Sequence, residues 1–440
     1  MSNYKKILFI DAALHKKDAT GITLSNLFAF WPKENLFMIG PQGNIQLSQK
    51  EGYENTYVLD NKDYYHRFPL GFILYTWRLL RKKVSFSKSN ETSDKSLEFS
   101  DSVDRTDKFS LGSLFSLLFQ RLGLDHLFFR NVISIELREW VINADPDYFY
   151  AVLSTRHSIF FAEELKKEFD KPLIIHIMDD WPAAIGSDSI FKNYWNKKIN
   201  QEFKQLLVIV NKRVAISEAM AKEFESRFSG NWVYFHNPID LDQWLPHQKK
   251  TISKHSDLIK IAYFGRIGRA NEEALLRFID SIKELNEMHL FSIQIDIYSS
   301  NILPNTYLEL DFIKVHGFID HTEIPQVICS YDFLILPISF NDEDFTFSRL
   351  SIPTKLSEYL ISGVPVIVFA PKETAVYKFA FKTNSAFLIN TTITTEIGAR
   401  LRLFFFDENM QNVVSKNARM VANQHFSIET INKKFNNLFL

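Results

Sequence analysis

Hydrophobic and polar residues follow two patterns that alternate along most of the chain. Short apolar runs, typical of strands buried on both faces, lie at 5–11, 147–154, 172–178 and 364–369. Between such runs, apolar residues recur every three or four positions, as on one face of a helix; an example is the series Leu275, Phe278, Ile279, Ile282, Leu285 and Met288. Because strands that alternate with amphipathic helices form parallel sheets covered by helices, the pattern predicts an α/β fold.

The length of the chain predicts more than one domain. Its 440 residues exceed what a single compact core usually holds. A polar segment at 245–258 precedes a fresh strand and is expected to be a linker. We therefore expect one domain over 1–245, a second over 259–425, and a last helix at 427–440. The polar, serine-rich segment at about 85–109 is expected to be a flexible insertion in the first domain.

Composition and charge narrow the class of protein. The formal net charge of −1 argues against a nucleic-acid-binding protein, which usually has a basic excess. The single cysteine, Cys329, excludes an internal disulfide and fits a reducing cytoplasm. No apolar run reaches the roughly 18–20 residues that span a bilayer, and the N-terminus lacks the pattern of a signal peptide. There are no Cys/His spacings of the metal-binding kind. We expect a cytoplasmic globular protein.

One aromatic segment leaves two interpretations open. Residues 68–83 combine an apolar, aromatic helix pattern with the terminal cations Arg78, Arg81, Lys82 and Lys83. Such a helix can lie on an anionic membrane surface, with its aromatic side chains in the interface and its cations on phosphates. It can equally be a core helix whose cations favour its C-terminus. The sequence thus predicts either a peripheral membrane contact or ordinary packing.

The most informative stretch lies at 351–369, where a loop, a helix, a glycine stop at Gly363 and a buried strand follow one another. A helix start offers free amides and a partial positive charge, which attract an anion. Lys355 adds a full charge there, and Glu358 can accept hydrogen bonds from sugar hydroxyls. The pair suits a diphosphate joined to a ribose. The alternative is an ordinary helix start with a solvated Lys and Glu.

Two further elements carry candidate ligand-binding groups. The strand that begins at Ile259 ends in Gly265-Arg266, where the glycine allows a turn and the guanidinium can grip phosphate oxygens in a fork. Gly21, at the entry of a helix after the first strand, allows close approach of the backbone to a ligand. For Gly21 a plain helix entry is equally open.

Three titratable side chains lie at the carboxyl end of the strand at 172–178, namely His176, Asp179 and Asp180. Ligands in open parallel sheets gather at the carboxyl ends of strands. A carboxylate there can orient an acceptor hydroxyl, and a histidine can hydrogen-bond a sugar. The alternative is that Asp179 or Asp180 caps the next turn.

The order Gly265-Arg266, Gly317-Phe318 and Pro353-Thr-Lys-Leu-Ser-Glu358 resembles the retaining, GT-B-type glycosyltransferases of the group 1/family 4 kind. The resemblance implies two doubly wound Rossmann-like domains that face each other across a cleft. It also implies that a nucleotide sugar binds the C-terminal domain, with contacts from Gly265, Arg266, Gly317, Phe318, Thr354, Lys355, Leu356 and Glu358. Within that set, Arg266 would contact the diphosphate and Glu358 the ribose.

The resemblance also assigns the other side of the cleft. The acceptor would bind the N-terminal domain near Gly21, with His176, Asp179 and Asp180 facing the sugar, and the last helix would cross back to that domain. Two positions depart from the pattern. Leu350 stands where members often carry a second Glu, and Asn271 where they usually carry a Lys.

The expected activity is hexosyl transfer with retention of configuration, from a nucleotide-diphosphate sugar to the hydroxyl of a glycan or lipid-linked acceptor in polysaccharide or glycoconjugate synthesis. The cations would stabilise the departing diphosphate, so neither a metal nor a cofactor is expected. Two alternatives stay open. A nucleotide-sugar 2-epimerase of the same fold would use Asp179 and Asp180 as acid and base. A non-catalytic partner subunit would explain Leu350 and Asn271.

Overall fold

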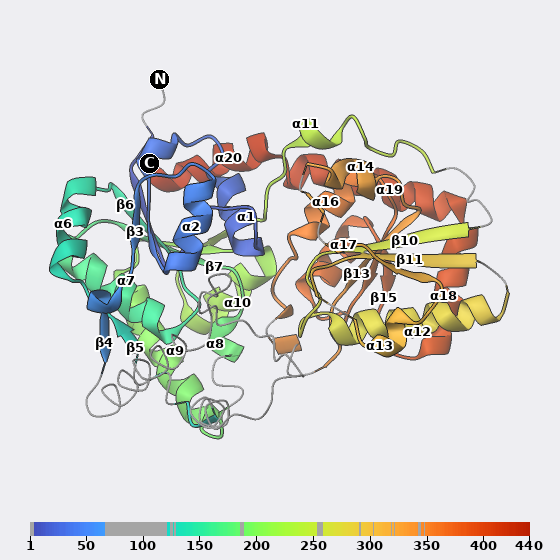
Figure 1. Ribbon diagram of the computed structural model, residues 1–440, viewed down its shortest axis with the longest axis horizontal. Coiled ribbons are helices and arrows are strands. Elements are labelled where there is room, and N and C mark those ends of the chain that lie inside the picture. The colour runs from blue at the N-terminus through green and yellow to red at the C-terminus, as the bar shows by residue number, and fades with distance from the viewer. Residues whose placement is uncertain are drawn as a thin grey trace, which may run out of the picture.

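The computed structural model describes residues 4–66, 121–123, 126, 129–184, 189–252, 258–289, 292–301, 303–317, 319–320, 322–341, 345–346 and 348–440. These residues form two α/β domains side by side (Figure 1). The aromatic segment at 68–83 and the insertion expected at 85–109 lie outside the described residues, so both remain predictions. None of the described helices combines the length and the apolar content that crossing a membrane requires.

The N-terminal domain is built on a seven-stranded sheet in the order β3-β2-β1-β6-β7-β8-β9, in which every pair is parallel. Its strands are β1 Ile7–Ile10, β2 Leu36–Gly40, β3 Thr56–Val58, β6 Tyr148–Val152, β7 Leu173–Ile177, β8 Lys212–Ala215 and β9 Trp232–Tyr234. Its helices are α1 Ala19–Leu27, α2 Gln42–Lys50, α6 Ile135–Ala144, α7 Arg156–Phe169, α8 Trp181–Ala184, α9 Lys192–Ile209 and α10 Glu218–Phe228; α11 Leu241–Trp244 packs against the C-terminal domain. A small antiparallel pair, β4 Tyr64–His66 and β5 Phe129–Asn131, stands apart from the sheet.

The C-terminal domain repeats this plan with a six-stranded parallel sheet in the order β12-β11-β10-β13-β14-β15. Its strands are β10 Leu258–Phe264, β11 Ser292–Tyr298, β12 Ile313–Val315, β13 Phe333–Pro337, β14 Val366–Phe369 and β15 Phe387–Ile389. Its helices are α12 Glu272–Glu287, α13 Asn305–Leu308, α14 Ile324–Ile328, α16 Lys355–Ser362, α17 Ala375–Thr383, α18 Thr394–Phe406 and α19 Glu408–His425; α20 Ile428–Asn436 follows.

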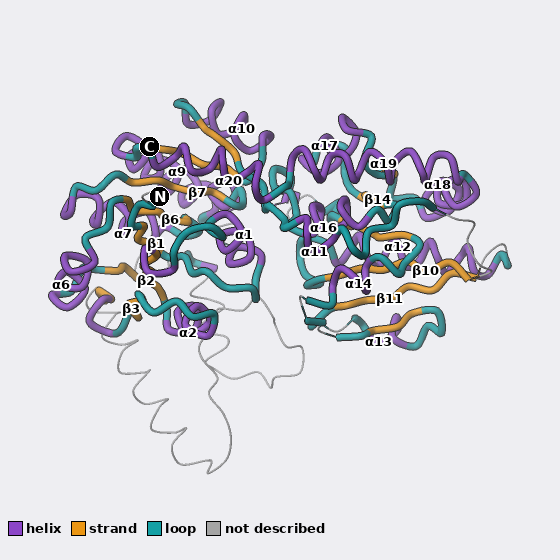
Figure 2. The backbone as a smooth tube through the Cα atoms, turned by 90° about the horizontal axis from the view of Figure 1, so that it is seen from above, coloured by secondary structure: helices purple, strands orange, loops and turns teal. Residues whose placement is uncertain are grey.

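Each sheet carries a hydrophobic core on both faces, which is why its strands are apolar throughout. In β1, Leu8 packs into one cluster of buried residues and Phe9 into another, on opposite faces. In β10, Ala262 and Tyr263 divide in the same way between the two clusters of the second domain. Helices accordingly flank both sheets (Figure 2). This confirms the predicted pair of doubly wound domains.

The order of the strands fixes where each domain can bind a ligand. The chain winds outward from β1 to β2 and β3, and then returns to the other side of β1 with β6. In the second sheet it winds from β10 to β11 and β12, and returns with β13. The helices that follow the central strands therefore diverge to opposite faces at these two switch points. A crevice opens there at the carboxyl ends of the strands.

The chain crosses between the domains twice. The first crossing lies after Ile239; the second lies beside it, where the Ile239 amide donates to the Phe426 carbonyl at 2.8 Å and the Ile428 amide to the Ile239 carbonyl at 2.9 Å. Helix α20 then packs on α1 of the N-terminal domain (Figure 1). There the ring of Phe435 meets the ring of Phe28 edge-on, with 5.0 Å between centroids.

Helix α16 shows why the stretch at 351–369 folds as its sequence predicts. Leu356, Tyr359 and Leu360 are fully buried on one face of the helix. Gly363 ends the helix with a φ of 73°, a left-handed conformation that favours glycine. A Cβ atom at Gly363 would also lie 2.1 Å from the Lys249 carbonyl oxygen. The chain then enters β14, whose four residues are all buried.

Candidate functional site

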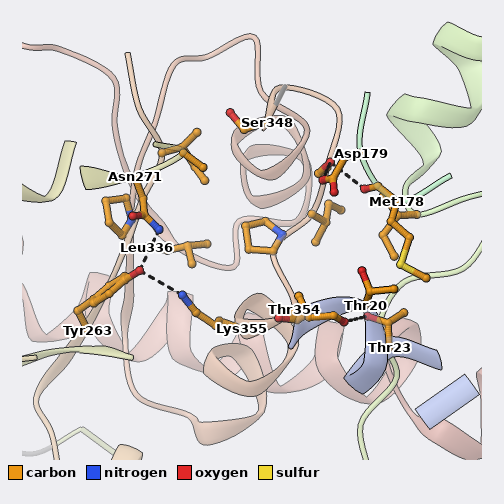
Figure 3. A pocket seen from close by; sticks show the side chains of 18 residues that line it. Thr20, Thr23, Met178, Asp179, Tyr263, Asn271, Leu336, Ser348, Thr354 and Lys355 are labelled. Atoms are coloured by element: carbon orange, nitrogen blue, oxygen red, sulfur yellow. Dashed lines mark hydrogen bonds between the residues drawn. The ribbon is translucent and has the colours of Figure 1, made fainter. Parts of the chain in front are cut away.

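A cavity of about 190 Å³ lies between the two domains (Figure 3). The N-terminal domain contributes residues of α1 and of the loops after β7 and β8, namely Ala19, Thr20, Thr23, Met178, Asp179 and Ile216. The C-terminal domain contributes Tyr263, Ala270, Asn271, Leu336, Pro337, Ile338, Ser348, Ser351, Ile352, Pro353, Thr354 and Lys355. The cavity thus brings together carboxyl-end loops of both sheets.

Lys355 enters this cavity from the first residue of α16. Its Cε atom would lie 1.9 Å, and its Nζ atom 2.1 Å, from a Cβ atom built on Gly265. Gly265 has a φ of 121°, where side chains are strongly disfavoured. The absence of a side chain at Gly265 therefore makes room for Lys355. This contact joins two segments that lie far apart in the sequence.

Arg266 follows Gly265 on the turn after β10, and its side chain is exposed and outside the lining of the cavity. Its carbonyl oxygen accepts hydrogen bonds from the Tyr263 hydroxyl at 2.7 Å and from Asn271 Nδ2 at 3.2 Å. Within the described part of the chain, neither Arg266 nor Lys355 forms an ion pair. Two cations that form no ion pair with described residues therefore stand on neighbouring backbone elements at the mouth of the C-terminal sheet, which favours an anionic ligand.

The first turn of α16 offers further groups to that ligand. Thr354 lines the cavity, and its side chain does not cap the helix, although the Leu356 amide donates to the Pro353 carbonyl at 3.0 Å. Glu358 lies one turn beyond Lys355 and is half-buried. Burial raises the pKa of Glu358 to about 7, and the nearby charge of Lys355 opposes this rise. Leu356 is fully buried, so only its backbone can face a ligand.

Gly317 and Phe318 are the pair that the resemblance assigns to the base of the nucleotide sugar, and the structure describes Gly317. Gly317 follows β12 with a φ of 71°, and no atom lies within 4 Å of a Cβ atom built on it. It does not line the cavity. Phe318 lies outside the described residues, so its role remains a prediction.

Of the three titratable residues at the carboxyl end of β7, the structure brings Asp179 to the cavity. Its carboxylate accepts a hydrogen bond from the Ser351 hydroxyl at 3.1 Å, across the domain boundary. Burial, and to a smaller extent the charge of Asp180, raises the pKa of Asp179 to about 6. Asp179 thus faces the cavity that Lys355 also lines, as a carboxylate whose protonation changes close to neutral pH.

His176 and Asp180 do not reach the cavity. The His176 imidazole is fully buried, its Nδ1 atom lies 2.7 Å from the Tyr150 hydroxyl, and burial lowers its pKa to about 3. Asp180 is also fully buried, and Arg227 donates to its Oδ1 atom at 2.7 Å. Neither side chain lines the cavity in this structure, and their expected contact with the sugar stays a prediction. Both belong to the interior of the N-terminal domain.

Gly21 lies in the first turn of α1 and is buried against His15 rather than against the cavity. A Cβ atom at Gly21 would lie 2.6 Å from the His15 carbonyl oxygen and 2.7 Å from its ring. The neighbouring Thr20 and Thr23, together with Ala19, are the residues of α1 that line the cavity. Gly21 therefore allows the loop to pack closely, which places these two threonines.

The loop before α16 docks onto the N-terminal domain. Leu350 packs into the hydrophobic cluster of that domain, and its carbonyl oxygen accepts a hydrogen bond from the Ser217 hydroxyl. Arg349 donates to Glu223 at 3.0 Å, and Ser351 donates to the Met178 carbonyl at 3.0 Å. These contacts hold the two walls of the cavity together.

Three of the residues that shape the cavity carry no distinctive signal in the sequence: Tyr263, Ser351 and Thr20. Tyr263 is part of an apolar strand pattern that indicates only core. Ser351 and Thr20 are small polar loop or helix-start residues of a kind found throughout the chain. Asn271 occupies the N-cap position of α12, but its side chain makes no capping hydrogen bond and instead bonds Tyr263 and Arg266.

Two Rossmann-like domains with a shared cavity at their carboxyl edges define the GT-B fold. The solved structures that resemble this chain agree. HepE from Anabaena in complex with UDP-glucose matches with a TM-score of 0.59 and 14% identity over 99% of each chain. Sucrose-phosphate synthase from Thermosynechococcus elongatus matches with a TM-score of 0.59 and 11% identity, over 99% of this chain and 98% of that one. At these identities the likeness shows the fold.

A more distant structural match is a putative UDP-N-acetylglucosamine 2-epimerase from Listeria monocytogenes. Its TM-score is 0.52 with 10% identity, over 98% of this chain and 95% of that one. Residues 259–392 match the family model described as Glycosyl transferases group 1. The C-terminal domain thus carries a glycosyl transferases group 1 domain, which confirms the resemblance predicted from its motifs. A comparison with curated proteins found no significant match.

Proposed function

We propose that this protein is a GT-B glycosyltransferase that moves a hexosyl group from a nucleotide-diphosphate sugar to an acceptor hydroxyl. The observation that carries the proposal is the close contact of Lys355 with Gly265, which puts Lys355 and the Arg266 turn together beside a cavity between the domains. The group 1 match over residues 259–392 supports it. So does the likeness to a protein solved with UDP-glucose.

On the donor side, we assign the diphosphate to Lys355, Arg266 and the first amides of α16. Negative charge develops on the diphosphate as the bond to the sugar breaks, and fixed positive groups stabilise that charge without reorganising. Because these groups belong to the protein, we expect transfer to proceed without a metal ion. Glu358 would accept hydrogen bonds from the ribose, and the backbone at Gly317 and Phe318 would contact the base.

On the acceptor side, we assign Asp179 to the incoming hydroxyl. With a pKa of about 6, its carboxyl is mostly ionised at neutral pH and can accept a hydrogen bond from that hydroxyl. We propose a glycan or lipid-linked acceptor and transfer with retention of configuration, as in polysaccharide or glycoconjugate synthesis. We propose that the protein works in the cytoplasm, at the inner face of a membrane.

The size of the cavity bears on how the donor enters. About 190 Å³ is less than the roughly 300–1,000 Å³ of typical ligand sites. We therefore propose that the domains separate to admit the nucleotide sugar and close again for transfer. Closure would exclude water, which otherwise hydrolyses the donor.

A second candidate function is a nucleotide-sugar 2-epimerase. The raised pKa of Asp179 and the likeness to the putative epimerase favour it. An epimerase needs an acid and a base, however, and among the described residues that line the cavity Asp179 is the single carboxylate. The transferase is therefore the better-supported proposal.

The test begins with thermal shifts of the protein in UDP, GDP and ADP, followed by incubation with the matching nucleotide sugars. Release of nucleoside diphosphate together with a glycosylated acceptor supports the transferase. A change at C2 of the recovered sugar, seen by NMR, supports the epimerase. Nucleotide binding without any turnover supports a non-catalytic partner subunit and contradicts both.

A further inference from the structure

We propose that Tyr263 is a positioning residue whose hydroxyl holds Lys355 in place and ties it to the turn that carries Arg266. The inference deepens the proposed function, since it concerns how the diphosphate-binding cations are arranged. Tyr263 lies in β10, two residues before Gly265, and is 1% exposed. Its hydroxyl is the point at which the two segments are joined.

Three hydrogen bonds meet at this hydroxyl. Lys355 Nζ lies 3.1 Å from the oxygen and Asn271 Nδ2 lies 2.9 Å from it, and the hydroxyl lies 2.7 Å from the Arg266 carbonyl oxygen (Figure 3 shows the first two). An ammonium can only donate and a carbonyl can only accept. The hydroxyl therefore accepts from Lys355 and donates to Arg266.

The orientation of the Asn271 amide is fixed independently. Its Oδ1 atom accepts a hydrogen bond from the Gly268 amide at 3.1 Å, which turns Nδ2 toward Tyr263. The Tyr263 hydroxyl thus uses its one donor and both of its acceptor positions. A hydroxyl with all three positions occupied cannot rotate without losing a bond, so its direction is set by the fold.

Two further contacts, with the Tyr263 ring and with the backbone at Gly265, restrict the side chain of Lys355. Its Nζ atom lies 4.7 Å from the centroid of the Tyr263 ring, in the range of a cation–π contact. Its side chain passes over Gly265, where a Cβ atom would lie within 2.1 Å of Nζ. One of the three ammonium N–H groups is directed at Tyr263, which leaves two for a ligand.

The same hydroxyl also restrains the cation on the neighbouring turn. The Arg266 carbonyl is bonded by both Tyr263 and Asn271, which fixes the backbone from which the guanidinium extends. A binding group whose supports are fixed in advance loses less conformational freedom when the ligand arrives. Tyr263 thereby prepares both cations for one diphosphate.

The variant Tyr263→Phe tests this, because it removes the hydroxyl and keeps the ring. The full-length protein, without nucleotide, is treated with a limiting amount of an amine-acylating reagent. The rate at which Lys355 is acylated is measured by mass spectrometry. We expect about threefold to tenfold faster labelling of Lys355, the factor that loss of one hydrogen bond allows. The expected affinity for the nucleoside diphosphate falls by a similar factor, with KM for the donor raised more than kcat is lowered.

Tyr307→Phe is the matched control, because its hydroxyl bonds Asp280 on the surface, outside the cavity. It should leave both readouts unchanged. Asn271→Ala removes a second bond to the same hydroxyl and should act in the same direction as Tyr263→Phe, with a smaller effect. Wild-type labelling of Lys355 in a folded Tyr263→Phe protein would overturn the positioning role. If the wild-type protein binds no nucleoside diphosphate, the proposed function fails, and the labelling still decides the role of Tyr263.

Discussion

Lys355 and Gly265 lie in contact although 90 positions separate them, since a Cβ atom at Gly265 would come within 1.9 Å of the lysine side chain. Gly265 directly follows β10, a central strand of the C-terminal sheet, and Lys355 is the first residue of α16. The contact depends on the absence of a side chain at Gly265 and on the long, flexible side chain of Lys355. It is the geometric basis of the proposed diphosphate site.

Replacing Gly265 by alanine should therefore displace Lys355. The new methyl group meets the lysine side chain, and a φ of 121° strains any residue other than glycine. We expect Gly265→Ala to weaken binding of the nucleoside diphosphate by at least about tenfold, measured by isothermal titration calorimetry. Gly268→Ala in the same turn is the control, because nothing lies within 4 Å of a Cβ atom there. Equal effects of the two substitutions would contradict the steric argument.

Glu358 should cost the protein stability at alkaline pH. Its pKa rises from 4.5 to about 7 on folding, so the unfolded state releases its proton at lower pH. The folded state is then penalised progressively as the pH rises from about 4.5 to about 7, and the penalty stays constant above that pH at on the order of 3 kcal/mol. Glu358→Gln should raise the melting temperature at pH 8 and leave it nearly unchanged at pH 4.5.

The same substitution should weaken nucleotide binding, because an amide is a poorer acceptor for ribose hydroxyls than a carboxylate. Stabilisation together with weaker binding is typical of a residue kept for function. If Glu358→Gln leaves nucleotide affinity intact, the carboxyl does not contact the ribose.

Asp179 should set the acidic limb of the pH–rate profile. Its pKa is raised to about 6, and the proposed role requires the ionised form. We expect kcat to fall as the pH drops through about 6, and Asp179→Asn to lower kcat by about 10²-fold or more while KM for the donor changes little. Asp311→Asn, at an exposed position of the second domain, should follow the wild-type profile. An unchanged acidic limb in Asp179→Asn would assign that limb to another group.

Transfer should persist in the presence of a chelator. In the proposed site, Arg266, Lys355 and the amides of α16 would supply the positive charge that opposes the departing diphosphate. We expect initial rates in 5–10 mM EDTA, a range on the order of that used to strip divalent ions, to match those without it. A loss of activity that added Mg²⁺ or Mn²⁺ restores would show that the protein cations are insufficient.

Much of the fold follows from hydrophobic periodicity alone. The apolar runs at 147–154 and 172–178 contain β6 and β7, and Ser217 caps α10 by accepting from the Met220 amide at 3.0 Å. Helix α16 ends at Gly363 because its left-handed backbone favours glycine. These features depend on local chemistry, so a single sequence is enough to predict them.

The direction of individual side chains was harder to predict. All five residues of β7 are buried, so no alternation of polar and apolar residues shows which face His176 occupies. The residues beside Tyr263 in the sequence are apolar, so the pattern predicts only a core position for it. Its role depends on Asn271 and Lys355, which other segments of the chain bring to it. Leu350 belongs to the second domain in sequence and packs into the core of the first. Such contacts arise from the arrangement of the domains and leave no local pattern.

The most direct test of the account is a double-mutant cycle of Arg266→Ala and Lys355→Ala, measured as the affinity for a nucleoside diphosphate and for the corresponding nucleoside. Each substitution should weaken diphosphate binding by roughly 1.5–3 kcal/mol and leave the nucleoside unaffected, and the two effects should be coupled because both cations hold one ligand. Lys283→Ala on the exposed face of α12 should change neither affinity. Wild-type affinity for the diphosphate in both single variants would contradict the assignment of the site.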